Sequence, residues 1–167
     1  MNSSRSTTLP SANSQRDHSL QRRRILCVDD DPNISAAIAR RLRPLSIDVL
    51  AAYSGMQGYW QLVTKSPDAV IVDLAMPNGS GTEMIECVMR NHVIRHTPIL
   101  VLTGSSDPAC RRRLSQLGIS GFLRKPVACE ILLRELASLI DLGDLALPDG
   151  CRETCCASAA LDLLPIE

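Results

Sequence analysis

The chain has 167 residues, and its 18 basic and 18 acidic side chains give a formal charge of zero. This length suits one domain with tails, and the neutral balance gives no electrostatic reason to expect nucleic-acid binding. No apolar stretch approaches the ~20 residues of a membrane-spanning helix, and the Ser- and Arg-rich N-terminus lacks the apolar core of a signal peptide. The sequence therefore predicts a cytoplasmic protein that contacts neither a membrane nor nucleic acid directly.

Charge and apolar pattern divide the chain into three parts. Residues 1–24 carry five Arg and one Asp, whereas residues 141–167 carry six acidic side chains and one Arg. Residues 1–22 are polar and lack an apolar period, so we expect a disordered tail there. Residues 23–142 hold the alternating pattern of a folded domain. Residues 143–167 are too short for an output domain and are expected to form a C-terminal tail.

Short apolar runs alternate with amphipathic stretches in the central part. Strands are predicted at 25–28, 48–52, 69–72, 98–102 and 121–124. A first helix is predicted to start near Pro32, because apolar residues recur at i, i+3, i+4 and i+8 from Ile34 to Leu42. Further helices are predicted at 55–65, 82–91, 107–117 and 127–142.

The order of these elements predicts the fold class. Strands that are apolar on both faces and alternate with helices are typical of a buried parallel sheet covered by helices on each side. Right-handed crossovers leave few topologies, and the flavodoxin-like order 2-1-3-4-5 is one of them. We therefore expect an α/β fold, a doubly wound five-stranded parallel sheet with five helices.

Four of the five predicted strands end on residues able to hold a phosphoryl group or a metal ion. These residues are Asp29, Asp30 and Asp31 after the first strand, Asp73 after the third, Thr103 after the fourth and Lys125 after the fifth. In an open parallel sheet, ligands bind outside the carboxyl ends of the strands, where the strand order reverses. We therefore interpret these residues as parts of one site.

Aspartates brought together at this edge need a cation. Two carboxylates about 4 Å apart repel each other by roughly 4 kcal/mol at an effective dielectric constant near 20. Ligands that are all oxygen select a hard ion, and Mg²⁺ typically takes one or two carboxylates plus a phosphate. Asp29, Asp30 and Asp73 therefore predict a Mg²⁺ site. For Asp31, capping the helix that starts at Pro32 is an equally good interpretation.

The choice of lysine at position 125 supports a phosphoryl site. The chain contains 16 Arg and only two Lys, Lys65 and Lys125. A compact ammonium suits one oxygen of a small phosphoryl group better than a planar guanidinium does. A solvated lysine at a strand end is the alternative. The sequence leaves open whether the Lys125–Pro126 peptide bond is cis.

Together these motifs resemble the receiver domain of bacterial two-component response regulators, the CheY-like family. The matching residues are Val28-Asp29-Asp30-Asp31, Val72-Asp73-Leu74-Ala75-Met76-Pro77, Leu102-Thr103-Gly104 and Lys125-Pro126. The resemblance covers residues 25 to about 141. It implies a phosphoacceptor in a phosphorelay, a signalling switch rather than an enzyme, whose partners are a sensor histidine kinase or histidine phosphotransfer protein and a downstream protein target.

The resemblance also implies a role for each site residue. Asp73 is the expected phosphorylation site, and Asp29, Asp30, Asp73 and the backbone carbonyl of Ala75 are the expected Mg²⁺ ligands. Lys125, Thr103 and Gly104 are expected to contact the phosphoryl group, and Thr103 and Phe122 are expected to act as the switch. The fourth helix, fifth strand and fifth helix are the expected signalling surface, and the fourth and fifth helices are a candidate homodimer contact.

Three residues depart from the usual family pattern. Gly104 stands where Ala is usual, Phe122 lacks the hydroxyl of the commoner Tyr, and Arg124 is bulkier than usual. The Arg run at 111–113 is interpreted as a solvated face, with contact to an acidic partner or dimer mate as the alternative.

Two other functions compete with a phosphoacceptor. A receiver that has lost phosphorylation would be a protein-interaction module, but all five site residues are present. A phosphatase of the haloacid-dehalogenase type would use Asp29 and Asp31 with a downstream Lys. That family needs a further acid after a strand beyond the Lys, and only Glu130 and Glu135, in a predicted helix, follow Lys125.

Overall fold

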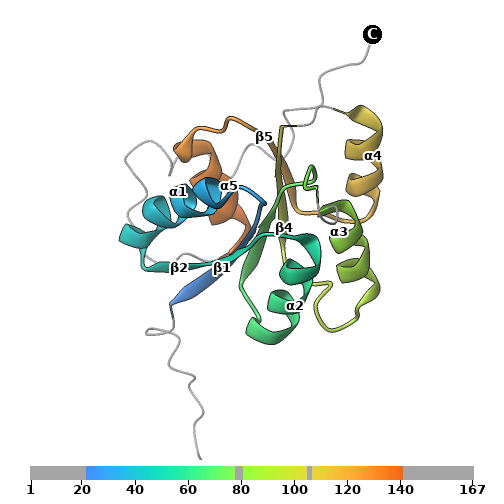
Figure 1. Cartoon of the computed structure of the whole chain (residues 1–167), viewed down its shortest axis with the longest axis horizontal. Coiled ribbons are helices and arrows are strands. Elements are labelled where there is room, and N and C mark those ends of the chain that lie inside the picture. Colours follow the sequence, from blue (N-terminus) through green and yellow to red (C-terminus); the bar gives the residue numbers. More distant parts are fainter. Residues whose placement is uncertain (1–21, 78–80, 105–106, 141–167) are drawn as a thin grey trace, which may run out of the picture.

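The computed structural model describes residues 22–77, 81–104 and 107–140. They form one five-stranded sheet with helices on both faces (Figure 1). The strands are β1 Arg23–Val28, β2 Ile47–Ala52, β3 Ala69–Val72, β4 Ile99–Thr103 and β5 Gly121–Arg124. The helices are α1 Pro32–Leu42, α2 Gly55–Lys65, α3 Gly81–Arg90, α4 Pro108–Gln116 and α5 Cys129–Leu139, with a short 3-10 helix, η1, at Arg43–Leu45.

Neighbouring strands are parallel throughout the sheet, and their order is β2-β1-β3-β4-β5. This confirms the predicted α/β class and the flavodoxin-like order. β1 and β3 are neighbours, with Val28 opposite Val72 in register. Because both strands end at this pair, the residues that follow, Asp29 and Asp73, leave the sheet next to each other.

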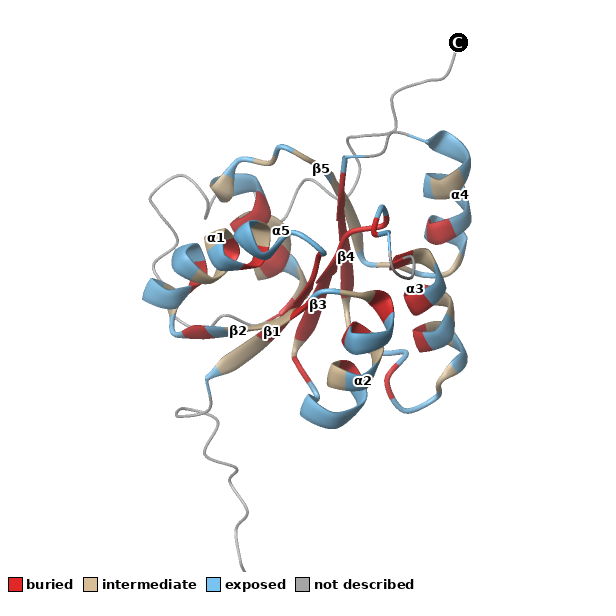
Figure 2. Cartoon of the chain, in the orientation of Figure 1, coloured by how far each residue is buried: buried red, intermediate tan, exposed pale blue. Residues whose placement is uncertain are grey.

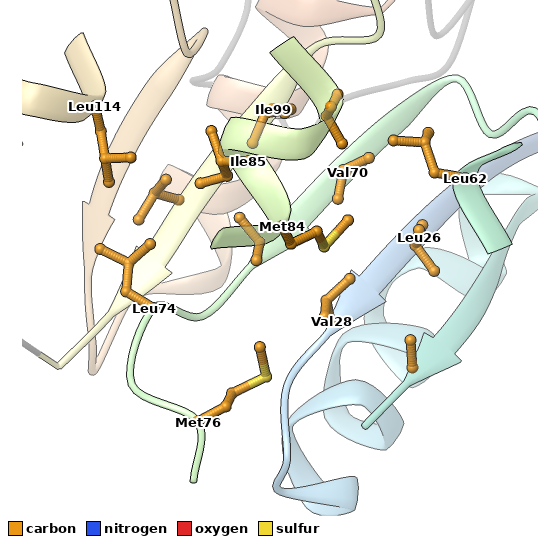
Figure 3. Packing of buried hydrophobic residues seen from close by; sticks show 14 of the residues in the cluster. Leu26, Val28, Leu62, Val70, Leu74, Met76, Met84, Ile85, Ile99 and Leu114 are labelled. Carbon is orange, nitrogen blue, oxygen red and sulfur yellow. The ribbon is translucent and has the colours of Figure 1, made fainter. Parts of the chain in front are cut away.

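Alternate side chains of the strands fill two apolar layers. On one face, side chains such as Leu26 and Val70 pack with α2, α3 and α4 (Figure 3). On the other face, Ile25 and Ile71 pack with α1 and α5. All four residues of β3 are buried, and Figure 2 shows burial concentrated at the centre of the sheet. A central strand covered on both faces explains the unbroken apolar run at 69–72.

Three helices begin at polar side chains that accept a hydrogen bond from a backbone N–H of the first turn. The side chain of Asp31 accepts from Asn33 at 2.9 Å, Asp107 from Ala109 at 2.9 Å and Ser54 from Gln57 at 3.3 Å. The open question about Asp31 is thereby answered, because its side chain caps α1.

The predicted element boundaries differ most at α5. The sequence predicts a helix over 127–142, whereas α5 spans Cys129–Leu139, because Ala128 and Ile140 both have extended backbone. Positions 141–142 lie outside the described residues. The sequence also gave no indication of η1. The Lys125–Pro126 bond, which the sequence left open, is cis.

Most of the two predicted tails lies outside the described residues. Arg22 belongs to the described part, and its guanidinium forms an exposed ion pair with Asp48 at 3.2 Å. In the ranges that the structure describes, no helix is both long enough and apolar enough to cross a membrane.

Candidate functional site

Backbone pairing continues past the ends of β1 and β3 and positions the first two acidic residues. The N–H of Asp29 donates to the carbonyl of Ala52, and the N–H of Asp73 donates to the carbonyl of Val28, both at 2.9 Å. Both residues are buried, with 3% of Asp29 and 7% of Asp73 exposed. The sheet therefore fixes two carboxylates side by side at its carboxyl edge.

Asp30 completes a group of three carboxylates. One oxygen from each of Asp29, Asp30 and Asp73 lies within 4.8 Å of the others. Asp30 is exposed, unlike its two neighbours, so the group is open to solvent on one side. The structure thus brings together the three side chains that the sequence assigned to a metal site, and it leaves Asp31 outside the group.

Lys125 lies against the two buried carboxylates. Its Nζ is 2.6 Å from Oδ2 of Asp29 and 2.6 Å from Oδ2 of Asp73. The backbone N–H of Lys125 donates to the carbonyl of Thr103 at 2.9 Å. The end of β5, which pairs with β4, therefore positions the Lys125 side chain. This bridging position excludes the alternative of a freely solvated strand-end lysine.

Asp73 is held by donors on several sides. Its Oδ1 accepts a hydrogen bond from the N–H of Ala75 at 3.1 Å, while Oδ2 accepts from Lys125. Burial alone would raise the pKa of Asp73, but hydrogen bonds from Lys125, the Ala75 N–H and the Thr103 hydroxyl, with the positive charge of Lys125, lower this pKa below its ordinary value of 3.8. Asp73 is therefore an ionised, positioned carboxylate at neutral pH.

Lys125 shows the reciprocal effect. Burial alone would lower its pKa, but the hydrogen bonds and negative charges of Asp29 and Asp73 raise the pKa above its ordinary value of 10.5. Beneath the site, burial and the charge of Asp29 raise the pKa of the Cys27 thiol to about 12. Cys27 is thus protonated at neutral pH and behaves as an apolar side chain. The charged groups of the site lie at the carboxyl edge of the sheet.

The remaining predicted residues surround this group. Thr103 is fully buried, whereas Gly104 and Ala75 are exposed. The residues that follow Asp73 are anchored, because Leu74 and Met76 insert into the apolar layer on either side of Ala75 (Figure 3). The backbone next to Asp73 is thereby fixed, with its N–H available to the carboxylate.

The start of α3 packs directly on the site, a feature that the sequence did not indicate. A Cβ added at Gly81 would lie 1.9 Å from the backbone oxygen of Asp73. Only glycine permits this approach, so α3 begins against the backbone carbonyl of Asp73.

The donor set fits a hard divalent cation. Three carboxylates supply only oxygen atoms, and two of them are fixed by the sheet while the third faces solvent. Oxygen ligands in such a partly open group suit Mg²⁺, which retains several of its waters. The Lys125 ammonium neutralises part of the negative charge at the same oxygens.

Residues 25–137 match the family model of the response regulator receiver domain. The chain belongs to this family. It is 34% identical over 128 residues to the sensory/regulatory protein RpfC of Xanthomonas campestris pv. campestris, covering 75% of this chain and 18% of that protein. It is 31% identical over 118 residues to hybrid signal transduction histidine kinase D of Dictyostelium discoideum, covering 71% of this chain and 8% of that protein. The chain thus spans less than a fifth of the length of these curated relatives.

Solved receiver structures have the same fold. The chemotaxis protein CheY4 of Vibrio cholerae is 28% identical, with a TM-score of 0.67 over 72% of this chain and 100% of that chain. The signal receiver domain of a response regulator from Bermanella marisrubri is 33% identical, with a TM-score of 0.65 over 71% of this chain and 98% of that chain.

In this receiver domain, Phe122, a predicted switch residue, makes a contact that the sequence did not indicate. Phe122 on β5 is half-buried, and the guanidinium of Arg111 on α4 lies over its ring. Arg113 forms an ion pair with Glu86 of α3. The Arg run at 111–113 is therefore only partly a solvated face. Nothing in the local sequence indicates these contacts, because each joins two different elements.

A groove of ≈ 440 Å³ adjoins the site on the α1 side of the receiver domain. Ile34, Ile38 and Arg41 of α1 line one wall, and Lys125, Pro126 and Val127 line the other. The surface next to the carboxylates is therefore a mostly apolar hollow with basic side chains at its margin.

Proposed function

We propose that Asp73 is the phosphoacceptor of this receiver domain and that the chain acts as a response regulator in a two-component system or phosphorelay. The observation that carries the proposal is the pair of 2.6 Å contacts from Lys125 to Asp29 and Asp73. A cation beside an ionised carboxylate supports this role, because it can neutralise charge on an incoming phosphoryl group. Such a protein is a signalling switch rather than an enzyme with a turning-over substrate.

Asp73 is suited to act as the nucleophile. In the proposed step, a carboxylate oxygen of Asp73 attacks the phosphorus of a phosphohistidine on a donor protein. The P–N bond breaks, the imidazole nitrogen keeps the bonding pair and takes up a proton, and an acyl phosphate forms on Asp73. Because the pKa of Asp73 lies below its ordinary value, no proton has to be removed first.

Phosphoryl transfer depends mainly on positioning and on neutralising charge. The Lys125 ammonium is proposed to move from the Asp73 carboxylate to an oxygen of the phosphoryl group. This needs only a small movement of a flexible side chain. The Thr103 hydroxyl and the backbone N–H of Gly104 are proposed to contact the other oxygens. The anchored loop around Ala75 keeps the attacking carboxylate oriented.

We further propose that Asp29, Asp30 and Asp73 hold Mg²⁺, with the backbone carbonyl of Ala75 as an additional ligand. The bound ion would neutralise charge on the phosphoryl oxygens during transfer. The exposed position of Asp30 gives the ion access from solvent.

Thr103 and Phe122 are the proposed switch. Phosphorylation changes the local charge by only about −0.5 to −1, since a phosphate brings about −1.5 to −2 and the carboxylate charge is lost. So small a change needs an element with two stable arrangements. The buried hydroxyl of Thr103 lies beside Asp73, and the half-buried Phe122 ring connects β5 to α4, so both can transmit the change to the α4–β5–α5 surface and a downstream protein.

The proposed donor is a sensor histidine kinase or a histidine phosphotransfer protein. The groove beside Lys125 supports this proposal, because a donor histidine must reach Asp73 from a surface that adjoins the site. A homodimer through α4 and α5 also stays a prediction, with Ile131 as the one large apolar side chain that the described part of α5 exposes. A cytoplasmic location and the lack of direct membrane or nucleic-acid contact stay predictions as well.

We also propose the domain limits given by the sequence, a receiver domain at 23–142 between tails at 1–22 and 143–167. The two competing functions are not favoured. A module without phosphorylation has no need for an exposed third carboxylate, Asp30, beside the Asp29–Lys125–Asp73 contacts. A phosphatase of the haloacid-dehalogenase type belongs to another family, and Glu130 and Glu135 both lie in α5 rather than after a strand.

The test is phosphorylation of the full chain by acetyl phosphate with Mg²⁺, followed by intact-mass spectrometry. The wild-type chain should gain one phosphoryl group, and Asp73→Asn should gain none. Asp31→Asn is the matched control, because Asn also caps helices and position 31 lies outside the carboxylate group. A wild-type mass that stays unchanged supports the interaction module. Steady hydrolysis of a phosphate ester that survives Asp73→Asn but not Asp29→Asn supports the phosphatase.

A further inference from the structure

Helix α2 carries apolar side chains on its outward face as well as on its buried face. Met56, Trp60 and Val63 recur at i, i+4 and i+7 and are 67%, 59% and 38% exposed. We call these three residues the α2 ridge. Tyr53, just before the helix, is 47% exposed. Four of the six large apolar side chains that are exposed in the described part of the chain thus belong to α2 or lie just before it in the sequence.

A groove runs beside the α2 ridge. It has a volume of ≈ 430 Å³ and lies between α2 and α3, with Tyr59 and Trp60 on one wall and Glu83, Cys87 and Arg90 on the other. Figure 1 shows the two helices side by side. They pack closely because Gly58 has no side chain, since a Cβ there would lie 2.8 Å from Sδ of Met84.

We propose that this surface is a homodimer interface in which the α2 ridge of each copy enters the α2–α3 groove of the other. The interface is separate from the carboxylate site, so it does not rest on phosphoryl transfer. Exposed apolar patches of this kind mark interaction sites, and Trp, Tyr and Met are enriched at the centres of interfaces. A ridge beside a groove on one surface is self-complementary, as a two-fold contact requires.

The charges on this surface favour a second copy. Lys65 is the only charged residue of α2, and it lies at the C-terminal end. Both helices lead from one parallel strand to the next, so α2 and α3 run in the same direction, and Glu83 and Arg90 lie at opposite ends of the groove. A two-fold axis across the helices reverses one copy, which brings Glu83 of one copy toward Arg90 of the other.

Neither a strongly acidic nor a strongly basic partner fits as well. Such a partner needs a surface of one sign, whereas this groove has one acidic and one basic residue and an apolar middle. The formal charge of the chain is zero, so two copies approach without long-range repulsion. The second copy is therefore the occupant that the surface favours.

Trp60 provides its own probe, because it is the only tryptophan in the chain. The full chain would be diluted from millimolar to low micromolar concentration, with sedimentation equilibrium and Trp fluorescence measured on the same samples. We expect a monomer–dimer equilibrium, and we expect Trp60 emission to move to the blue and iodide quenching to fall as the dimer forms. The substitution Trp60→Gln should raise the dimer Kd at least about tenfold.

One matched variant controls for loss of apolar surface in general. Val93→Gln alters an 86% exposed side chain between α3 and β4 and should leave the dimer Kd unchanged. Ile131→Gln, at a 42% exposed side chain of α5, distinguishes this interface from the α4–α5 contact, because it should weaken only a dimer formed through α5. Charge reversal tests the arrangement: Glu83→Arg or Arg90→Glu alone should weaken the dimer, and the double reversal should restore it.

Three outcomes would overturn the proposal. A chain that stays monomeric at every concentration, with constant Trp60 emission, excludes a second copy and leaves the surface to a different protein. A dimer weakened by Ile131→Gln but not by Trp60→Gln places the contact on α5 instead. A double reversal that fails to restore the dimer rejects the antiparallel pairing of the two copies. Each result concerns the unphosphorylated chain and leaves the proposed phosphoacceptor untouched.

Discussion

The guanidinium carbon of Arg111 lies 5.4 Å from the centroid of the Phe122 ring, so a cation–π contact joins α4 to β5. Phe122 also packs against the apolar layer beneath α2, α3 and α4. If this ring must move when Asp73 is phosphorylated, Arg111 holds it in the arrangement of the unphosphorylated protein. The contact therefore opposes the proposed switch.

Replacing Arg111 with Gln should loosen the Phe122 ring. Because exposed cation–π contacts contribute about 0.5–1 kcal/mol, we expect the free energy of unfolding to fall by about that amount. The NMR shift of the Phe122 ring that beryllofluoride causes with Mg²⁺ should be larger, and it should appear at a lower beryllofluoride concentration than in the wild-type chain. Phe122 is the only phenylalanine in the chain, so selective Phe labelling gives one NMR probe of the ring. Arg112→Gln removes the same charge from the next residue and should change neither quantity; equal effects from both variants would contradict the contact.

Lys125 competes with a cation for the oxygens of Asp29 and Asp73, since its Nζ lies 2.6 Å from each. Lys125→Met should therefore bind Mg²⁺ more tightly than the wild-type chain, as measured by isothermal titration calorimetry. Without Mg²⁺, the same variant should lose about 1–3 kcal/mol of unfolding free energy, because buried carboxylates lose their partner. Phosphorylation by acetyl phosphate should be slowed.

The chain supplies its own control for this prediction. Lys65, the only other lysine, lies exposed at the end of α2. Lys65→Met should leave Mg²⁺ affinity and phosphorylation unchanged. Weaker Mg²⁺ binding by Lys125→Met would mean that the ammonium supports the metal site rather than competing with it.

Much of the fold and site could be predicted because it depends on sequence-local signals. Apolar runs predicted the strands, with β3 and β5 at the expected residues. Polar residues at strand ends then predicted the site, because parallel strands end at a common edge. Asp29, Asp73 and Lys125 meet there although they lie far apart in the sequence.

The features that sequence reasoning missed depend on contacts between elements. Arg111 meets Phe122 only because α4 packs beside β5, and Gly81 meets Asp73 only because α3 starts against the backbone of the residue that follows β3. The early end of α5 also has no local signal, because Ile140 is apolar and would suit a helix, yet its backbone is extended.

Stability without Mg²⁺ should depend on pH through Asp73. Its native pKa lies below 3.8, because hydrogen bonds and the charge of Lys125 outweigh the effect of burial. The native state therefore binds this proton less readily than the unfolded chain does. The stabilisation is fully present above pH 3.8 and is lost as the pH falls through the lower native pKa. Lys125 behaves oppositely: its contribution is full below pH 10.5 and is lost as the pH rises through its raised native pKa.

Urea unfolding of the wild-type chain and Asp73→Asn, in the presence of EDTA, checks the acid side. The difference in unfolding free energy between the two proteins should shrink as the pH falls below 3.8. In a Lys125→Met background, the pH dependence of that difference should be smaller. A difference that stays constant down to acid-induced unfolding would show that Asp73 has no altered affinity for its proton.

Gly104, which stands where the family usually has Ala, should tolerate Ala. A Cβ built there meets no atom of the described residues within 4 Å, and its φ lies outside the left-handed region. Gly104→Ala should therefore raise the unfolding free energy by about 0.4–1 kcal/mol by restricting the unfolded chain. Gly58→Ala is the contrasting variant: its Cβ would lie 2.8 Å from both Met84 and Val28, so it should lower stability by about 1–3 kcal/mol. Urea unfolding of the two variants measures both changes, and destabilisation by Gly104→Ala would mean that the loop beside Thr103 needs glycine for a reason other than space.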